Sequence, residues 1–162
     1  MQIDEILQTT QSRNIQNALQ FWNWSRQGKQ LPAREDINLT EIPSLLLGLT
    51  LLDVVDGGQD YRVRYVGRNI INNQTLKVGQ LQSEMPAQEG RTLIRKRYQR
   101  VLDERRPVLQ RYVYTSFRGD SRLIEAVTCP LSDDGITINK LFSYGIDHGF
   151  TDISEEISDT LI

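Results

Sequence analysis

Residues 49–66 read LTLLDVVDGGQDYRVRYV, two strand-like segments on either side of a turn. Apolar and β-branched residues dominate 49–55, and residues 61–66 alternate between tyrosine or valine and arginine. Between the two segments, Asp56-Gly57-Gly58-Gln59 supplies glycines, which favour the positive φ angles of a tight turn. The stretch therefore predicts an antiparallel hairpin.

The remaining patterns predict a single α+β domain around this hairpin. Apolar residues at helical spacing predict an N-terminal helix from Ser12 to Gln27, and Gly28 suits its end. Short turns separate three further strand patterns, which favours consecutive antiparallel neighbours. We expect a five-stranded antiparallel sheet with helices on one face and an N-terminal helix. The other expected elements are a short helix at 40–47, a helix at 88–105, and strands at 108–117, 122–131 and 136–146.

The length and composition are those of a globular protein. The 162 residues are 38% hydrophobic and 25% charged, with a net charge of −2. We expect an N-terminal tail at 1–11, one domain at 12–148, and an acidic C-terminal tail or short helix at 149–162. No apolar run approaches the ~20 residues of a membrane span, and the N-terminus lacks the pattern of a secretory signal. The expected compartment is the cytoplasm, with no membrane partner.

Two scarce residue types narrow the possible chemistry. Cys129 is the only cysteine, which excludes an internal disulfide and a cysteine-clustered zinc site. His148 is the only histidine, which excludes two-histidine metal motifs. Paired carboxylates at catalytic spacing, phosphate-binding glycine loops and nucleophile elbows are absent from the sequence. The sequence therefore predicts a protein that is not an enzyme and has no metal site.

The polar side chains of the predicted strands are the candidate ligand-binding residues. They are Arg62, Arg64, Tyr112, Tyr114 and Glu125. An inward-facing arginine would need a carboxylate such as Glu125 or a bound anion, because an unpaired buried charge is costly. In the alternative interpretation, both arginines point to water. Trp24 lies away from the apolar stripe of its helix, so it either anchors an interface or folds under a neighbouring segment.

The sequence disfavours flavin and haem as cofactors. Gly67–Gln74 superficially resembles the flavin-binding box of blue-light sensors, but Ile70 stands where those proteins have a reactive cysteine. His148 follows the last predicted strand at the domain edge, a poor position for a haem ligand. Flavin and haem are therefore not expected, and any other cofactor is unknown.

The helix at 88–105 is rich in arginine, and its charges spread around the polar circumference as on a solvated face. An anionic partner is the alternative: nucleic acid, an acidic protein surface or the acidic tail of this chain. No RNA-binding aromatic signature or helix-turn-helix pattern accompanies the helix, which disfavours nucleic acid.

Several segments resemble a PAS-like family that is common in alphaproteobacteria, often as stand-alone proteins. The resemblance is carried by Trp22, Gly28, 31–37, 51–54, 61–67, Gly79, Tyr98 with Val101, 106–108 and 130–135. It spans about residues 15–146, although Leu39 and Leu47 occupy places where the family often has other residues. The resemblance implies a PAS fold, sensing of small ligands or protein contacts, and dimerisation through a helix outside the sheet. It carries no catalytic motif and names no ligand.

Three functions remain open at this point. The first is a non-enzymatic sensory or regulatory domain that binds a small ligand between sheet and helices, forms a homodimer and passes its signal to a separate protein partner. The second is an interaction or dimerisation module with a filled core. The third is nucleic-acid binding through the basic helix at 88–105.

Overall fold

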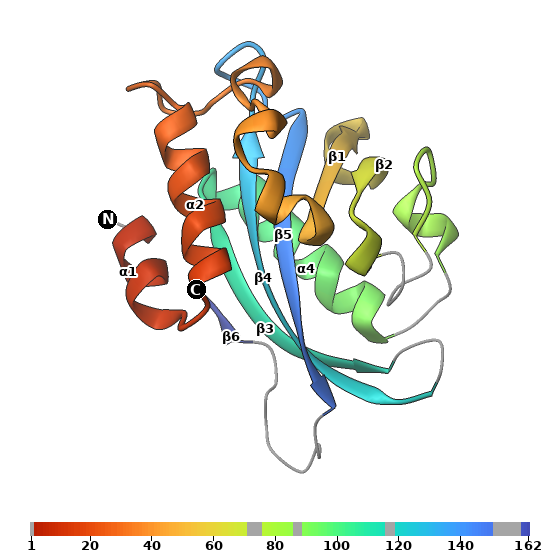
Figure 1. The fold of residues 1–162 in the computed structure, drawn as a ribbon. Coiled ribbons are helices and arrows are strands. Elements are labelled where there is room, and N and C mark those ends of the chain that lie inside the picture. Colours follow the sequence, from red (N-terminus) through yellow and green to blue (C-terminus); the bar gives the residue numbers. More distant parts are fainter. Residues whose placement is uncertain (1, 71–75, 86–88, 116–118, 151–159) are drawn as a thin grey trace.

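The computed structural model describes residues 2–70, 76–85, 89–115, 119–150 and 160–162 (Figure 1). The α-helices are α1 (Gln2–Thr9), α2 (Arg13–Ser25) and α4 (Glu89–Glu104). The strands are β1 (Leu49–Val55), β2 (Asp60–Val66), β3 (Val108–Thr115), β4 (Ser121–Leu131), β5 (Lys140–Phe150) and β6 (Thr160–Leu161). Within the described residues the 3-10 turns are η1 (Arg34–Asp36), η2 (Leu39–Glu41), η3 (Pro43–Gly48), η4 (Asp56–Gly58) and η5 (Gln82–Glu84).

The strands form one antiparallel sheet in the order β2-β1-β5-β4-β3-β6. The predicted hairpin is confirmed, because β1 and β2 pair from Thr50–Val66 to Val55–Asp60. Its turn places Asp56, Gly57 and Gly58 at positive φ, which glycine adopts without steric cost. The five predicted strands lie side by side, and the first of them pairs with the last, Leu49 opposite Tyr144.

Helices cover both faces of the sheet (Figure 1). Consecutive residues of β5 show the two sides: the Phe142 ring lies 6.2 Å from the Phe21 ring of α2, whereas Ser143 shares a hydrogen bond with Thr128, which contacts α4. We call the face toward α4 the inner face and the face toward α2 the outer face. The expected N-terminal helix thus covers the face opposite α4, and buried side chains fill both layers.

The two expected terminal tails differ from the structure where it describes them. Residues 2–9 form α1, whose Ile3 and Ile6 are buried and join the core because they repeat at helical spacing. At the other end, Thr160–Leu161 forms β6 on the edge of β3, so these residues are neither tail nor helix. Leu109 and Ile162 exchange backbone hydrogen bonds of 2.7 and 2.9 Å there. Both ends of the chain therefore add to the folded domain.

Two other expected boundaries shift. The strand expected at 136–146 begins at Lys140, because the carboxylate of Asp134 accepts hydrogen bonds from the backbone of Ile136 and Thr137 and holds a turn. The expected short helix at 40–47 is replaced by the 3-10 turns η2 and η3. Among the described residues, no helix is both long and apolar enough to cross a bilayer.

Candidate functional site

A buried arginine lies between α4 and the inner face of the sheet. Only 3% of Arg97 is exposed to solvent. Its Nε donates to Thr128 Oγ1 of β4 at 2.8 Å, and its Nη1 donates to Gln110 Oε1 of β3 at 2.7 Å. Two strands of the sheet therefore hold one guanidinium from the helix.

This contact belongs to a polar row that crosses three strands. Thr128 Oγ1 lies 2.8 Å from Ser143 Oγ of β5, so a second hydrogen bond continues the row. Gln110 also donates from Nε2 to the Leu93 carbonyl oxygen of α4 at 2.9 Å. Gln110, Thr128 and Ser143 are all buried. Hydrogen bonds offset the cost of burying such groups, and the row fixes where α4 rests on the sheet.

Aromatic rings surround the guanidinium. The Arg97 Cζ atom lies 5.2 Å from the ring centroid of Tyr98 and 5.7 Å from that of Tyr112, within cation–π range. The Tyr98 ring packs edge to face on Tyr61 at 4.9 Å. Burial raises the pKa of Tyr61 to about 12, and burial likewise raises the pKa of Tyr98. Both phenols therefore stay protonated and able to donate at neutral pH.

No carboxylate of the described residues forms an ion pair with Arg97. A buried cation is stable only when its surroundings replace the water it has lost. Here two neutral oxygens and two aromatic faces do so. They solvate the charge without neutralising it, so the inner face keeps a positive potential that favours an anion or a strong hydrogen-bond acceptor.

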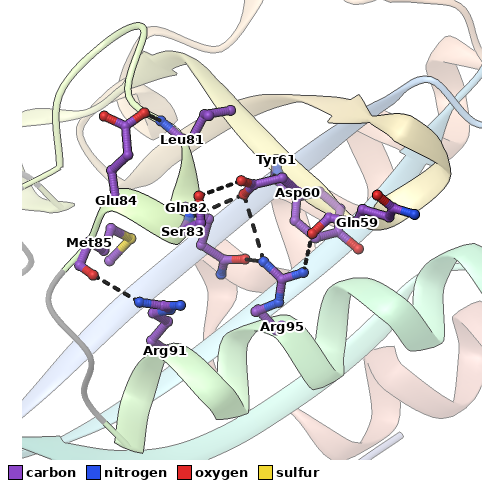
Figure 2. A network of polar contacts seen from close by, with 10 residues as sticks. All are labelled: Gln59, Asp60, Tyr61, Leu81, Gln82, Ser83, Glu84, Met85, Arg91 and Arg95. Atoms are coloured by element: carbon purple, nitrogen blue, oxygen red, sulfur yellow. Dashed lines mark hydrogen bonds and ion pairs between the residues drawn. The ribbon is translucent and has the colours of Figure 1, made fainter.

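A second polar network fixes the first half of α4 to β2 and η5 (Figure 2). Arg95 Nη1 lies 3.7 Å from Asp60 Oδ1 and donates to Gln82 Oε1 at 3.3 Å, while its Nη2 donates to the Gln59 carbonyl oxygen at 2.5 Å. Asp60 also accepts from Ser83 Oγ at 2.5 Å. The network ties two chain segments, residues 59–60 and η5, to one side chain of the helix.

The same network controls the charge of Asp60. Burial alone would raise the pKa of this carboxyl, but hydrogen bonds from Ser83 and from the Tyr61 amide, together with the nearby Arg95 cation, outweigh burial and hold the pKa below its ordinary value. Asp60 is therefore ionised at neutral pH and keeps its partner Arg95 in place.

Two donors near α4 are buried without a hydrogen-bond partner among the described residues. They are the Tyr61 hydroxyl and the Gln82 side-chain nitrogen Nε2. An unsatisfied buried donor costs about 1–3 kcal/mol. Such groups point to a missing acceptor, because most buried polar atoms in proteins are paired. The inner layer thus combines a buried cation with two donors that lack an acceptor.

The structure divides the predicted ligand-binding residues between the two faces. Tyr112 lies on the inner face beside Arg97. Arg62 and Arg64 lie on the outer face: Arg62 donates to the Gly79 carbonyl oxygen at 2.8 Å, and Arg64 pairs with Asp53. The alternative in which both arginines point away from the interior is therefore the one observed.

Glu125 and Tyr114 complete the predicted set. Glu125 is buried on the outer face, where its oxygens lie 3.2 Å from His148 Nε2 and 3.4 Å from Arg111 Nε. Tyr114 pairs with Arg122 in the sheet, and its side chain lies outside the described residues. The candidates therefore do not meet in one site, and their ligand-binding roles stay predictions.

Arg97 is a site residue that the sequence pattern does not single out. The charge pattern groups it with the solvated arginines of its helix, yet it lies on the buried stripe formed by Ile94, Tyr98 and Val101. Its position three residues after Ile94 and four before Val101 is the signal that could have found it.

The remaining candidates lie on the surface or carry no cofactor. Trp24 is 58% exposed and stacks on Phe21 with ring centroids 6.4 Å apart, so it does not fold under a neighbouring segment. Ile70 of the flavin-like box is described, whereas residues 71–74 of that box lie outside the described residues. No three metal-ligating side chains gather within the described part of the chain.

The structure is thus an α+β domain, a single antiparallel sheet of this strand order with one helix across its polar-lined inner face. A family model described as PAS domain matches residues 10–143, and the chain belongs to this family. The family expected from the sequence and the PAS fold are thereby confirmed.

Solved structures of the protein VqmA are similar to this chain. A structure described as VqmA bound to DPO has a TM-score of 0.52 and 15% identity, covering 69% of this chain and 57% of that one. The VqmA–ligand–DNA complex from Vibrio cholerae has a TM-score of 0.51 and 16% identity, covering 68% and 51%. A Vibrio cholerae VqmA dimer without target DNA has a TM-score of 0.51 and 15% identity, covering 70% and 53%.

At these identities the likeness shows the shared fold alone. The chain matches only about half the length of these VqmA structures. No curated protein matches the chain.

Proposed function

We propose that this protein is a non-enzymatic sensory or regulatory PAS domain that binds a small molecule between α4 and the inner face of the sheet. The observation that carries the proposal is Arg97, a buried guanidinium that is hydrogen-bonded to Thr128 and Gln110 but has no carboxylate partner among the described residues. The structure described as VqmA bound to DPO, which shares the fold, supports a small-molecule ligand.

The proposed ligand is a small anion or a molecule rich in hydrogen-bond acceptors. Arg97 supplies the positive charge, and the Tyr61 hydroxyl and the Gln82 amide supply donors that lack partners in the described structure. Each group would gain an acceptor on binding, which removes part of the cost of its burial. The ligand shifts the protein toward whichever arrangement of α4 it binds more tightly, and this difference in affinity is the signal.

The test is to identify small molecules that co-purify with the protein. The wild type, Arg97→Met and Arg100→Met are purified in parallel, denatured, and their released molecules compared by mass spectrometry. Arg100 is the matched control, because it lies on the same helix and pairs with Glu104 at the surface. We expect a bound molecule in the wild type and in Arg100→Met, and its loss in Arg97→Met.

The ligand proposal fails on either of two results. One is a wild-type protein that releases no small molecule and whose melting temperature no anionic metabolite raises. The other is a bound molecule retained equally by all three proteins, which would place it away from Arg97.

A second candidate function, homodimerisation or binding of a signalling partner, is supported by Trp24. A large aromatic side chain with 58% of its surface exposed, backed by Phe21, is typical of an interface anchor. Trp24→Ala should lower the mass measured by light scattering to that of the monomer, or abolish capture of a partner. Leu47→Ala is the control, because Leu47 is also a large exposed hydrophobe, at 52%, and lies outside α2. Equal masses for the wild type and both variants would remove Trp24 as an anchor of self-association.

The arginines of α4 do not support nucleic-acid binding through this helix. Arg91 donates to the Met85 carbonyl oxygen, Arg95 belongs to the Asp60 network, and Arg97 is buried. Arg100, the fourth arginine of α4, lies at the surface but pairs with Glu104. A helix that binds phosphates needs cations that are both at the surface and available to the phosphates. We therefore propose no role of α4 in DNA binding, and duplex DNA titrated at low salt should show no affinity that falls steeply as salt is added.

A further inference from the structure

A pocket opens on the outer face of the sheet, on the side opposite Arg97. It has a volume of about 310 Å³, at the lower end of the range for small-molecule sites. Four leucines from β1, β4 and β5 line it, together with Arg34 from η1 and the charged side chains of Asp53, Arg64 and Lys140. By strand register Leu51 and Leu131 lie on the outer face, whereas Leu52 and Leu141 alternate to the inner face. Leu51 and Leu131 therefore form the apolar wall beside the charged rim.

Arg34 is the cation of the rim that has no carboxylate partner among the described residues. Its Nη1 donates to the Ile37 carbonyl oxygen at 2.9 Å, which holds the side chain against its own turn. By contrast, Lys140 Nζ lies 3.1 Å from Asp133 Oδ2, and Arg64 is paired with Asp53. Arg34 is therefore the positive charge of the pocket that is available to pair with a bound anion.

Asp53 sets a second requirement on the ligand. One of its carboxylate oxygens pairs with Arg64, and the other, Oδ1, is buried without a hydrogen-bond partner among the described residues. A bare anion in this pocket would be repelled by Asp53, whereas a molecule that also carries a donor would offer it a hydrogen bond. Asp53 lines the pocket, and 22% of its side chain is exposed.

We propose that the outer pocket binds a small aliphatic molecule that carries a carboxylate and an adjacent amino or hydroxyl group, the chemistry of a free amino acid or a hydroxy acid. The ligand carboxylate pairs with Arg34, its donor bonds to Asp53, and its aliphatic part packs on Leu51 and Leu131. This site is independent of the proposed ligand beneath α4, because the two lie on opposite faces of the sheet.

The experiment titrates the ¹⁵N-labelled protein with three probes at millimolar concentration and follows its amide resonances. Free leucine carries both groups, isocaproate carries only the carboxylate, and isoamylamine carries only the amine. We expect leucine to shift amides around Arg34, Asp53 and Lys140 and not those around Arg97, and to bind at least about tenfold more tightly than either single-group probe.

Variants locate the contacts. Arg34→Gln and Asp53→Asn should each weaken leucine binding about tenfold. Arg62→Gln should leave it unchanged, because Arg62 lies on the same face but bonds to the Gly79 carbonyl oxygen and does not line the pocket. The proposal is overturned if leucine shifts no pocket amide, if isocaproate binds as tightly as leucine, or if Arg34→Gln binds leucine like the wild type. Shifts around Arg97 alone would overturn it too, because they would assign leucine to the inner layer.

Discussion

Gln110→Leu should destabilise the protein more than Arg97→Met, although the arginine makes more of the contacts. Gln110→Leu leaves the buried guanidinium with Thr128 as its remaining hydrogen-bond acceptor among those described. Removing one partner of a buried charge costs about 3–5 kcal/mol. Because the hydrogen bond to Thr128 survives, we expect Gln110→Leu to lose about 3 kcal/mol of unfolding free energy, the lower end of this range. Arg97→Met removes the charge itself and takes a donor away from two neutral oxygens, Gln110 Oε1 and Thr128 Oγ1, the second of which keeps its hydrogen bond to Ser143. The cost is about 1–3 kcal/mol.

The double variant Arg97→Met/Gln110→Leu tests whether the cost of Gln110→Leu comes from an unsatisfied buried charge or only from lost contacts. With both side chains apolar, neither the buried charge nor the amide oxygen that it bonded remains, and the hydrogen bond between Thr128 and Ser143 is untouched. We expect a loss of about 1 kcal/mol, well below the sum of the single variants.

Urea unfolding and thermal unfolding at neutral pH, both followed by circular dichroism, give the stabilities of the wild type, the two single variants and the double variant. At about 2–4 °C per kcal/mol, the melting temperature of Gln110→Leu should fall by about 6–12 °C. Additive single losses, or a greater loss in Arg97→Met than in Gln110→Leu, would refute the view that Arg97 is a solvated buried charge.

Three further predictions concern the fold around the site. In Gly67→Ala, the new Cβ would clash with the carbonyl oxygens of Leu46 and Leu47 in η3, so this variant should lose more than about 3 kcal/mol in urea unfolding. Gly145→Ala, whose new Cβ would have its nearest neighbour at 3.7 Å, should stay within about 1 kcal/mol of the wild type. Equal losses would contradict this. Trp22→Phe removes the 2.9 Å hydrogen bond from the indole to the Pro130 carbonyl oxygen and should cost about 1–3 kcal/mol by the same assay; an unchanged midpoint would show that the bond is unimportant. The pKa of Asp60 is lowered in the folded protein, so ionised Asp60 stabilises the fold fully above the ordinary carboxyl pKa. This stabilisation is lost as the pH falls through the folded-state pKa. The free energy of unfolding should therefore fall less steeply between about pH 5 and pH 2 in Asp60→Asn than in the wild type. Parallel pH profiles for the two proteins would argue against the network of Figure 2.

The hairpin and the sheet were predictable because their signals are local. The glycines at 57 and 58 mark a turn that few other residues allow, and the alternation at 61–66 by itself places Tyr61 and Val63 on one face, the face that is buried. The long helix expected at 88–105 is observed at 89–104 for the same reason, a clear apolar stripe.

The ends of the chain and the site depend on contacts between distant residues. An eight-residue helix such as α1 is marginal by itself and forms here because Ile3 and Ile6 pack against the core. The short strand β6 exists only because the edge of β3 offers hydrogen bonds. Arg97 differs from its solvated neighbours because Gln110 and Thr128, from two strands distant in sequence, face it.

The two tryptophans lie in opposite environments, so tryptophan fluorescence can report on the interior of the protein. Trp22 is buried and bonded to a strand that also holds Arg97 on its other face, whereas Trp24 stands in solvent. Trp24→Phe would leave Trp22 as the single tryptophan. Trp22 is shielded from water-soluble quenchers and lies on the opposite side of β4 from the proposed ligand. Occupancy of the interior could then be followed by fluorescence without attaching a dye.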